Sequence, residues 1–200
     1  GFCFGVKKAV SQVEERLPEL PRPVRMYGYL VHNEEVVGRL LEQGVEIVEN
    51  LDDLADKGTL ILTAHGVPPL VKERLREFSN LTLLDTTCPK VGRAQAEAAD
   101  LARQGRWVII FGDQDHPETR AISQAAGKNT TIISRLEEAP LLDPDLKYGL
   151  VSQTTKSFLE YEKLERLLRN QGVNVECKNT ICPATQNRQQ EARWLAAPNE

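Results

Sequence analysis

Short runs of β-branched and aromatic residues alternate along the chain with longer segments whose apolar residues recur at helical spacing. The short runs are typical of buried strands, and spacing of i, i+3, i+4 and i+7 is typical of amphipathic helices. Their alternation predicts an α/β fold built from βα units on small parallel sheets. The predicted strands are residues 24–31, 45–48, 59–63, 81–84, 107–111, 130–133, 148–151 and 173–176.

Glycines mark the ends of two predicted helices. Gly44 follows a predicted helix over residues 34–43, and Gly172 follows a segment whose apolar positions include Leu164 and Leu168. Glycine adopts the left-handed conformation that commonly ends a helix, so both positions are natural stops. A last helix is predicted over residues 184–197, with an apolar face that includes Ala192, Leu195 and Ala196.

The predicted elements form an internal repeat. His116 follows His32 by 84 residues, Thr154 follows His65 by 89, and Cys182 follows Cys88 by 94. Cys3 precedes Cys88 by 85 residues, so it takes the equivalent position at the start of the first unit. A fixed order of elements repeated at such a period predicts two similar α/β units.

Each predicted unit begins with a cysteine in a turn before a helix. The expected domains are residues 1–87 and 88–181, with residues 182–200 starting a third unit. The first residues look like the middle of a motif, so we expect a chain trimmed at both ends from a protein of three units.

Composition narrows the class of protein. The 200 residues carry 25 Lys and Arg against 29 Asp and Glu, which leaves a net charge of −4 without a long basic run. Nucleic acid is therefore an unexpected partner. Apolar runs fall well short of the roughly 20 residues that span a bilayer, so no membrane segment is expected. The 4 cysteines are too few for a disulfide scaffold, which favours a reducing, cytoplasmic location.

Three of the cysteines share one predicted setting. Cys3, Cys88 and Cys182 lie at turns into helices, where backbone N–H groups and the helix dipole stabilise negative charge on sulfur. Such positions suit metal or cluster ligation. The alternative is three unrelated buried thiols, but the repeat favours ligation. A C-x-x-C pair is absent from the sequence, which argues against a zinc finger, and Cys177 is predicted to be an ordinary thiol.

Polar residues follow the predicted strands at the end where parallel sheets bind ligands. These are His32, His65, His116 and Thr154, and the histidines come just before helix starts. Helix N-termini and imidazoles favour an anion such as diphosphate, although strand-end histidines can also be plain loop residues. Glu118 adds a carboxyl group that could be held protonated near the anion, or could simply complement the helix dipole.

A set of motifs is spread over the whole chain: Gly1-Phe2-Cys3-Phe4-Gly5, Val31-His32-Asn33, Ala64-His65-Gly66, Thr86-Thr87-Cys88-Pro89, His116-Pro117-Glu118, Ser152-Gln153-Thr154-Thr155 and Asn179-Thr180-Ile181-Cys182-Pro183. As a set they resemble the 4-hydroxy-3-methylbut-2-enyl diphosphate reductase (LytB) family. The resemblance implies a trefoil-like arrangement of three α/β units around a central 4Fe-4S cluster. It also implies the last step of the non-mevalonate isoprenoid pathway, in which an allylic diphosphate is reduced with loss of water to isopentenyl and dimethylallyl diphosphates.

The same resemblance implies a role for each candidate residue. Cys3, Cys88 and Cys182 would hold the cluster, and a ferredoxin or flavodoxin would supply electrons. The diphosphate would be bound by His32, His65, His116 and Thr154. Glu118 would supply protons through Thr154, with His116 close to the proton path.

Departures from the family pattern accompany the match, and one of them is that the family's first strand, before the Gly-Phe-Cys motif, is not in the sequence. Pro183 stands where asparagine or tyrosine is expected, and the family's later serine and asparagine ligands for diphosphate are not in the 200 residues. The fragment by itself is therefore expected to be inactive. Two other classes stay open: a non-catalytic relative that binds a cluster or diphosphate, and a zinc hydrolase with Cys and His ligands.

Overall fold

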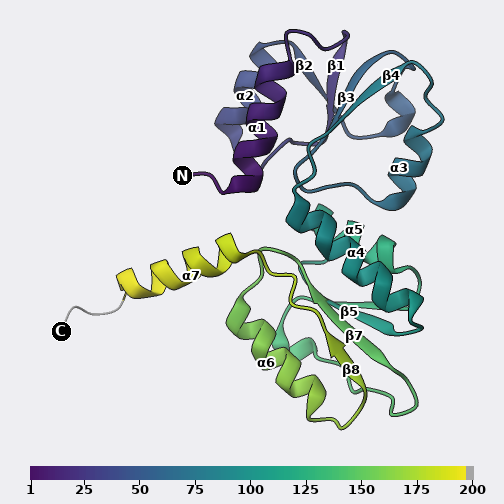
Figure 1. Cartoon of the computed structure of the whole chain (residues 1–200), viewed down its shortest axis with the longest axis vertical. Coiled ribbons are helices and arrows are strands. Elements are labelled where there is room, and N and C mark those ends of the chain that lie inside the picture. Colours follow the sequence, from purple (N-terminus) through teal and green to yellow (C-terminus); the bar gives the residue numbers. More distant parts are fainter. Residues whose placement is uncertain (197–200) are drawn as a thin grey trace. The chain divides into compact units, whose positions relative to one another are not determined.

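The computed structural model describes residues 1–196, which form two compact units that divide between Gly92 and Arg93 (Figure 1). Within the first unit, helices cover both faces of a four-stranded sheet. Its elements are α1 (Phe4–Arg16), β1 (Val24–Tyr27), α2 (Glu34–Glu42), β2 (Val45–Val48), the 3-10 helix η1 (Leu51–Asp53), β3 (Gly58–Leu62), α3 (Pro69–Leu75) and β4 (Leu81–Asp85).

The second unit repeats this order. Helix α4 starts in the first unit and packs mainly in the second, where it takes the place that α1 has in the first. The elements are α4 (Pro89–Arg103), β5 (Trp107–Phe111), α5 (Pro117–Ala126), β6 (Thr130–Ile133), η2 (Leu136–Glu138), β7 (Tyr148–Ser152), α6 (Phe158–Arg169), β8 (Val175–Cys177) and α7 (Pro183–Ala196).

Both sheets are parallel and have the same strand order. The first runs β2-β1-β3-β4 and the second β6-β5-β7-β8. Tyr27 pairs with Leu62 in the first, and Phe111 pairs with Ser152 in the second. These observations confirm the predicted α/β class and the repeat, since equal topology and register are what two copies of one unit require.

Alternating side chains of the central strands build a core on each face of a sheet. In β3, Ile61 packs with α1 and α2, whereas Leu60 and Leu62 pack with Leu75 of α3. In the second unit, Val108 and Ile110 of β5 pack with α4 and α5, whereas Ile109 and Phe111 pack with α6. Because helices cover both faces of each sheet, polar side chains can reach solvent or a ligand at the carboxyl ends of the strands.

All eight predicted strands are present, and six of them match within one residue at each end. The strand predicted over 24–31 ends at Tyr27, because Gly28 turns the chain with φ of 73°. The last strand starts two residues later than predicted, at Val175. The boundaries predicted at Cys88 and Cys182, and the third unit after Cys182, stay predictions.

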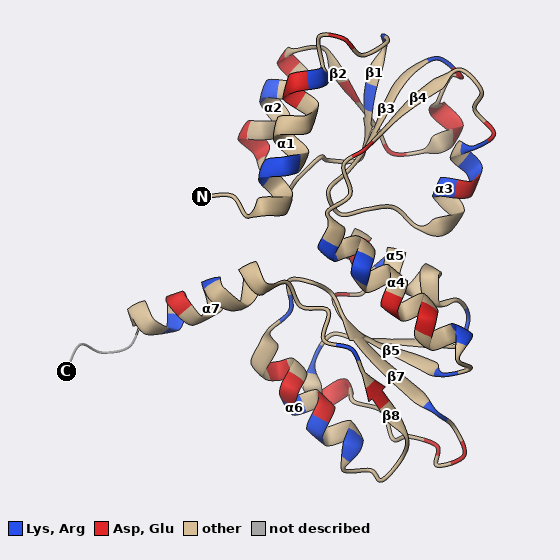
Figure 2. Cartoon of the chain, viewed as in Figure 1, with Lys and Arg blue, Asp and Glu red and all other residues tan. Residues whose placement is uncertain are grey.

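The last helix forms as predicted, from Pro183 to Ala196, and the predicted end at Ala197 lies outside the described residues. Within this helix, the structure buries none of the side chains. Charged residues gather on helices and loops, with acidic and basic residues mixed along α6 (Figure 2). Across residues 1–196, no helix has the length and apolar character needed to cross a membrane.

Candidate functional site

The strand order creates one topological switch point in each sheet. In the first, the chain leaves β1 toward one side and β3 toward the other, and in the second β5 and β7 diverge in the same way. Such points open a crevice beyond the carboxyl ends of the strands, where α/β proteins bind ligands. The candidate residues that the sequence predicts at strand ends lie at these two positions.

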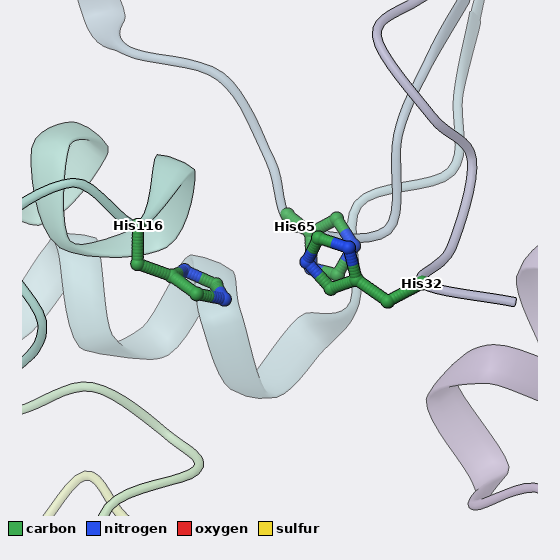
Figure 3. A group of neighbouring side chains, drawn as sticks. All are labelled: His32, His65 and His116. Carbon is green, nitrogen blue, oxygen red and sulfur yellow. The ribbon is translucent and has the colours of Figure 1, made fainter.

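His32 and His65 meet at the first switch point. His32 follows β1 and His65 follows β3, and their ring centroids are 4.1 Å apart with planes tilted by 33° (Figure 3). Asn33 begins α2 by accepting a hydrogen bond of 2.9 Å from the N–H of Val36. The paired imidazoles therefore lie beside a capped helix N-terminus, a combination that favours an anion.

His116 takes the corresponding place after β5 and caps α5 (Figure 3). Its Nδ1 accepts a hydrogen bond of 3.1 Å from the N–H of Glu118. A neutral imidazole that accepts at Nδ1 carries its proton on Nε2. His116 is thereby set as a donor at Nε2.

Glu118 and Thr154 meet at the second switch point. Glu118 lies in the first turn of α5 but is only 2% exposed, and Thr154, just after β7, is 5% exposed. The N–H of Thr154 donates to Oε1 of Glu118 at 2.6 Å, and the Thr154 hydroxyl lies 3.0 Å from Oε2. A carboxyl that only complemented the helix dipole would be exposed, as Glu34 and Glu35 are at the start of α2.

Burial controls the protonation of Glu118. Removal from water raises the pKa of the Glu118 carboxyl, and the two hydrogen bonds from Thr154 oppose this rise without cancelling it. Because Oε1 already accepts from the backbone, the proton of the neutral acid belongs on Oε2, which faces the Thr154 hydroxyl. The pair can therefore hold a proton and pass it through that hydroxyl.

Two cysteines end turns that are built in the same way. Before Cys88, Asp85 accepts from the N–H of Thr87, and the N–H of Cys88 donates to the carbonyl of Ala64 at 3.0 Å. Before Cys182, Asn179 accepts from the N–H of Ile181, and the N–H of Cys182 donates to the carbonyl of Thr154 at 2.9 Å. A buried threonine hydroxyl, of Thr86 or Thr180, bonds the neighbouring strand end in each turn.

All three predicted cysteines stand at helix starts. The carbonyls of Cys3, Cys88 and Cys182 each accept a hydrogen bond from the N–H four residues later, the first bond of α1, α4 and α7. Their thiols are free and partly buried. This confirms the predicted turn-to-helix setting, while ligation itself stays a prediction.

Gly5 leaves room for one of these sulfurs. A β-carbon placed on Gly5 would lie 2.5 Å from Sγ of Cys88, too close for any side chain. The Cys88 sulfur therefore rests against the first turn of α1, the helix that Cys3 begins. Two thiols near the start of α1, with space for the Cys88 sulfur, fit the sulfur ligands that an iron–sulfur group requires.

Cys177 is different in kind. It lies in β8, and burial raises the pKa of its thiol to about 12, with Glu165 adding to the effect. A thiol held protonated in this way is a poor metal ligand, which agrees with its predicted role as an ordinary cysteine.

Sequence reasoning missed the importance of Gln153 and Thr119, which are 1% and 0% exposed beside the Glu118–Thr154 pair. Gln153 stands within a motif, but its side-chain contacts depend on a strand pairing that a single sequence does not display. The cysteine turns also align the repeat more finely: Thr154 corresponds to Ala64, one residue from the predicted match with His65.

These features define a class of protein. It is a repeated parallel α/β protein with imidazoles and a buried acid at its switch points and with free cysteines at helix starts. The family profile described as "LytB protein" matches residues 1–200. The chain belongs to the LytB family, whose reductases are iron–sulfur oxidoreductases of the non-mevalonate isoprenoid pathway.

Curated relatives bear the name 4-hydroxy-3-methylbut-2-enyl diphosphate reductase. The protein from Geobacter metallireducens is 39% identical over 200 residues, covering 98% of this chain and 68% of the relative. The protein from Nitratiruptor sp. is 36% identical over 199 residues, covering 98% of this chain and 69% of the relative. The relatives are thus longer than this chain.

Solved structures of such reductases are also similar. The Plasmodium falciparum enzyme superposes with a TM-score of 0.86 at 30% identity, covering 95% of this chain and 61% of that one. A second structure, described as the terminal enzyme of the non-mevalonate pathway, has a TM-score of 0.81 at 33% identity and covers 98% of this chain and 70% of that one.

Proposed function

We propose that these 200 residues form part of the site that, in a protein of the relatives' length, reduces 4-hydroxy-3-methylbut-2-enyl diphosphate to isopentenyl and dimethylallyl diphosphates, the reaction for which the relatives are named. The reaction takes up two electrons and two protons. The bond between carbon and the hydroxyl oxygen breaks, one proton leaves with that oxygen as water, and the other adds to an end of the allylic system. The addition of that proton to either end gives the two products.

The observation that carries this proposal is the set of bonds around Thr154. Its N–H and hydroxyl bond Glu118, and its carbonyl accepts from the N–H of Cys182. A buried acid, a relay hydroxyl and a cysteine at a helix start are therefore linked through one residue. Reductive removal of a hydroxyl needs these parts together, because protons and electrons must reach the same carbon–oxygen bond.

In this proposal Glu118 is the acid. Its raised pKa keeps the carboxyl protonated at higher pH than an exposed glutamate, and its proton faces the Thr154 hydroxyl. Thr154 accepts that proton while giving its own to the leaving oxygen, so that the charge on Glu118 appears only as water forms. His116, held by its bond to the N–H of Glu118, lies on the same turn and donates from Nε2.

The histidines serve the diphosphate. His32 and His65 provide a pair of rings at the start of α2, and His116 provides a donor at the start of α5. Imidazole N–H groups and helix N-termini together neutralise an anion of high charge. We assign diphosphate binding to these three residues, with Thr154 contacting the substrate near its hydroxyl.

The cysteines would hold a 4Fe-4S cluster. Cys3, Cys88 and Cys182 offer three thiols at equivalent helix starts, and the space above Gly5 suits the Cys88 sulfur. A bound cluster supplies electrons one at a time, which it would receive from a ferredoxin or flavodoxin. The free state of all four cysteines suits a reducing compartment such as the cytoplasm.

The first test is chemical. Anaerobic purification of a protein extended to the length of the relatives, followed by iron, labile sulfide and zinc analysis, should find iron and sulfide in equal amounts with little zinc. Reduced viologen dye and the allylic diphosphate should then give both products, which the 200 residues alone should not give. Stoichiometric zinc without sulfide would point to a zinc hydrolase, and a cluster without turnover would point to a non-catalytic relative.

The second test addresses Glu118. Glu118→Gln keeps the shape of the side chain but removes its proton, so kcat should fall by roughly 10²-fold or more while KM stays nearly unchanged. Glu160→Gln, at an exposed first-turn position of α6, is the matched control and should change neither. A Glu118→Gln variant that mainly raises KM would show that Glu118 binds the substrate instead.

A further inference from the structure

A single buried amide connects the segments that carry the acid site. Oε1 of Gln153 accepts from the N–H of Asp113 at 2.9 Å and from the hydroxyl of Thr119 at 3.1 Å. Nε2 of Gln153 donates to the hydroxyl of Thr155 at 2.8 Å. The three partners belong to the loop after β5, the first turn of α5 and the loop after β7.

Those segments are the ones that present the proposed catalytic groups. Asp113 precedes His116 in its loop, Thr119 follows Glu118, and Thr155 follows Thr154. Because a backbone N–H only donates, the amide must turn its oxygen toward Asp113, and this fixes the direction of its other bonds. The Gln153 side chain therefore sets the spacing between Glu118 and Thr154 from both sides.

A glycine makes the close fit possible. A β-carbon on Gly112 would lie 2.5 Å from Oγ1 of Thr119 and 3.2 Å from Cβ of Gln153. Because Gly112, just after β5, has no side chain, Thr119 and Gln153 can both approach the backbone there. Thr119 is therefore held beside Gln153 both by close packing at Gly112 and by the hydrogen bond of its hydroxyl to Oε1 of Gln153.

The first unit has the same topology without this amide. The strand registers align Leu62 with Ser152, so Thr63 takes the place of Gln153 there. Gly28 takes the place of Gly112, and a β-carbon on it would meet no described atom within 4 Å. Since the unit folds without the amide contacts, their presence in the second unit is not a requirement of the fold.

We propose that Gln153 is a positioning residue, which with Thr119 and Gly112 holds the Glu118 carboxyl against Thr154 for proton delivery. This inference rests on the proposed reductase function, and it deepens that function by assigning the residues that set the geometry of its acid. Gln153 acts through its neighbours, whereas Glu118 and Thr154 meet the substrate.

Gln153→Met tests the proposal, because it keeps the length of the side chain but removes all three bonds. In the holoenzyme, kcat should fall about 10-fold or more with KM nearly unchanged, since small displacements of a reacting group are costly. Water reaching Glu118 should also lower its pKa toward the ordinary value, so the decline of kcat with rising pH should begin at lower pH. Gln171→Met is the control, because Gln171 also uses both ends of its amide, here to hydrogen-bond two backbone groups, but lies away from the acid.

A milder pair of variants covers the case in which Gln153→Met fails to fold. Thr119→Val removes one hydroxyl at nearly constant volume and should shift the pH profile in the same direction. Thr119→Ser retains the hydroxyl and should restore the wild-type profile. Activity that falls equally at every pH, in proportion to the loss of folded protein, would overturn the positioning role.

An infrared titration separates this inference from the proposed function. The carbonyl stretch of protonated Glu118, assigned by its loss in Glu118→Gln, can be followed with pH without turnover. A shifted titration in Gln153→Met without activity on the allylic diphosphate in the wild type would support the positioning role and overturn the reductase. Normal turnover with an unshifted titration in Gln153→Met would overturn the positioning role alone.

Discussion

At the scale of single residues, Glu118 departs most from what its sequence position suggests. It occupies a helix first turn, where glutamates are usually exposed, yet it is 2% exposed and bonded to a residue 36 positions away. Because burial raises the pKa of Glu118, the free energy of unfolding should depend on pH.

The pH dependence of stability follows from the sign of the shift. The folded chain binds the Glu118 proton more tightly than the unfolded chain, whose glutamates titrate near 4.5. The stabilisation from the protonated acid is therefore complete below that pH and is lost as pH rises through the folded pKa. Relative to Glu118→Gln, which does not titrate, the wild type should lose free energy of unfolding over this window.

Urea unfolding of both proteins at a series of pH values measures this difference. The Glu160→Gln control, at an exposed position, should track the wild type throughout. A difference between wild type and Glu118→Gln that stays constant or grows in favour of the wild type at high pH would show that burial does not raise the pKa.

The sequence predicted where the candidate residues lie, at strand ends and helix starts, better than it predicted what surrounds them. Cys88 and Cys182 were predictable because a turn, a proline and a helix start are local in sequence. The ring contact of His32 with His65, the burial of Glu118 and the contacts of Gln153 depend on which strands are neighbours. Such contacts come from tertiary pairing, which hydrophobic periodicity alone does not determine.

At the scale of elements, the structure differs from the prediction mainly in the loop between β1 and the start of α2. Most predicted strands agree with the structure because buried apolar runs are a strong signal. The main error was to extend the first strand past Tyr27, where an apolar loop follows. That loop contains Leu30 and Val31, which are buried but not paired in the sheet. It ends at His32 and leads into the cap of α2.

The cap of α2 supplies a prediction at this scale. Asn33→Ala removes the bond to the N–H of Val36 and should cost about 1 kcal/mol of the free energy of unfolding. Because the cap orients the helix start beside His32, affinity for inorganic diphosphate should also fall, as measured by calorimetry. Asn50→Ala removes a similar bond to Asp52 at the start of η1 and should leave the affinity unchanged. Equal losses of affinity in both variants would argue against a specific role for α2.

At the scale of the whole molecule, two units with one topology carry different chemistry. The first places a pair of histidines at its switch point, and the second places an acid and a hydroxyl there. In each unit a cysteine N–H also donates to a carbonyl just after the third strand, Cys88 to Ala64 and Cys182 to Thr154. The two units therefore share one backbone topology, and they differ in the side chains at their strand ends.

The proposed cluster gives the prediction that involves both units. If Cys3, Cys88 and Cys182 ligate one cluster, replacing any of them by serine should remove most of the iron and sulfide, because an assembled cluster is lost as a whole. Cys177→Ser should retain both, since that thiol is held protonated in β8. Iron and sulfide per chain after anaerobic reconstitution, with circular dichroism to verify folding, provide the measurement. A loss of about one third in each of the three variants would indicate separate sites, and an equal loss in Cys177→Ser would indicate that cysteine burial, rather than ligation, governs iron content.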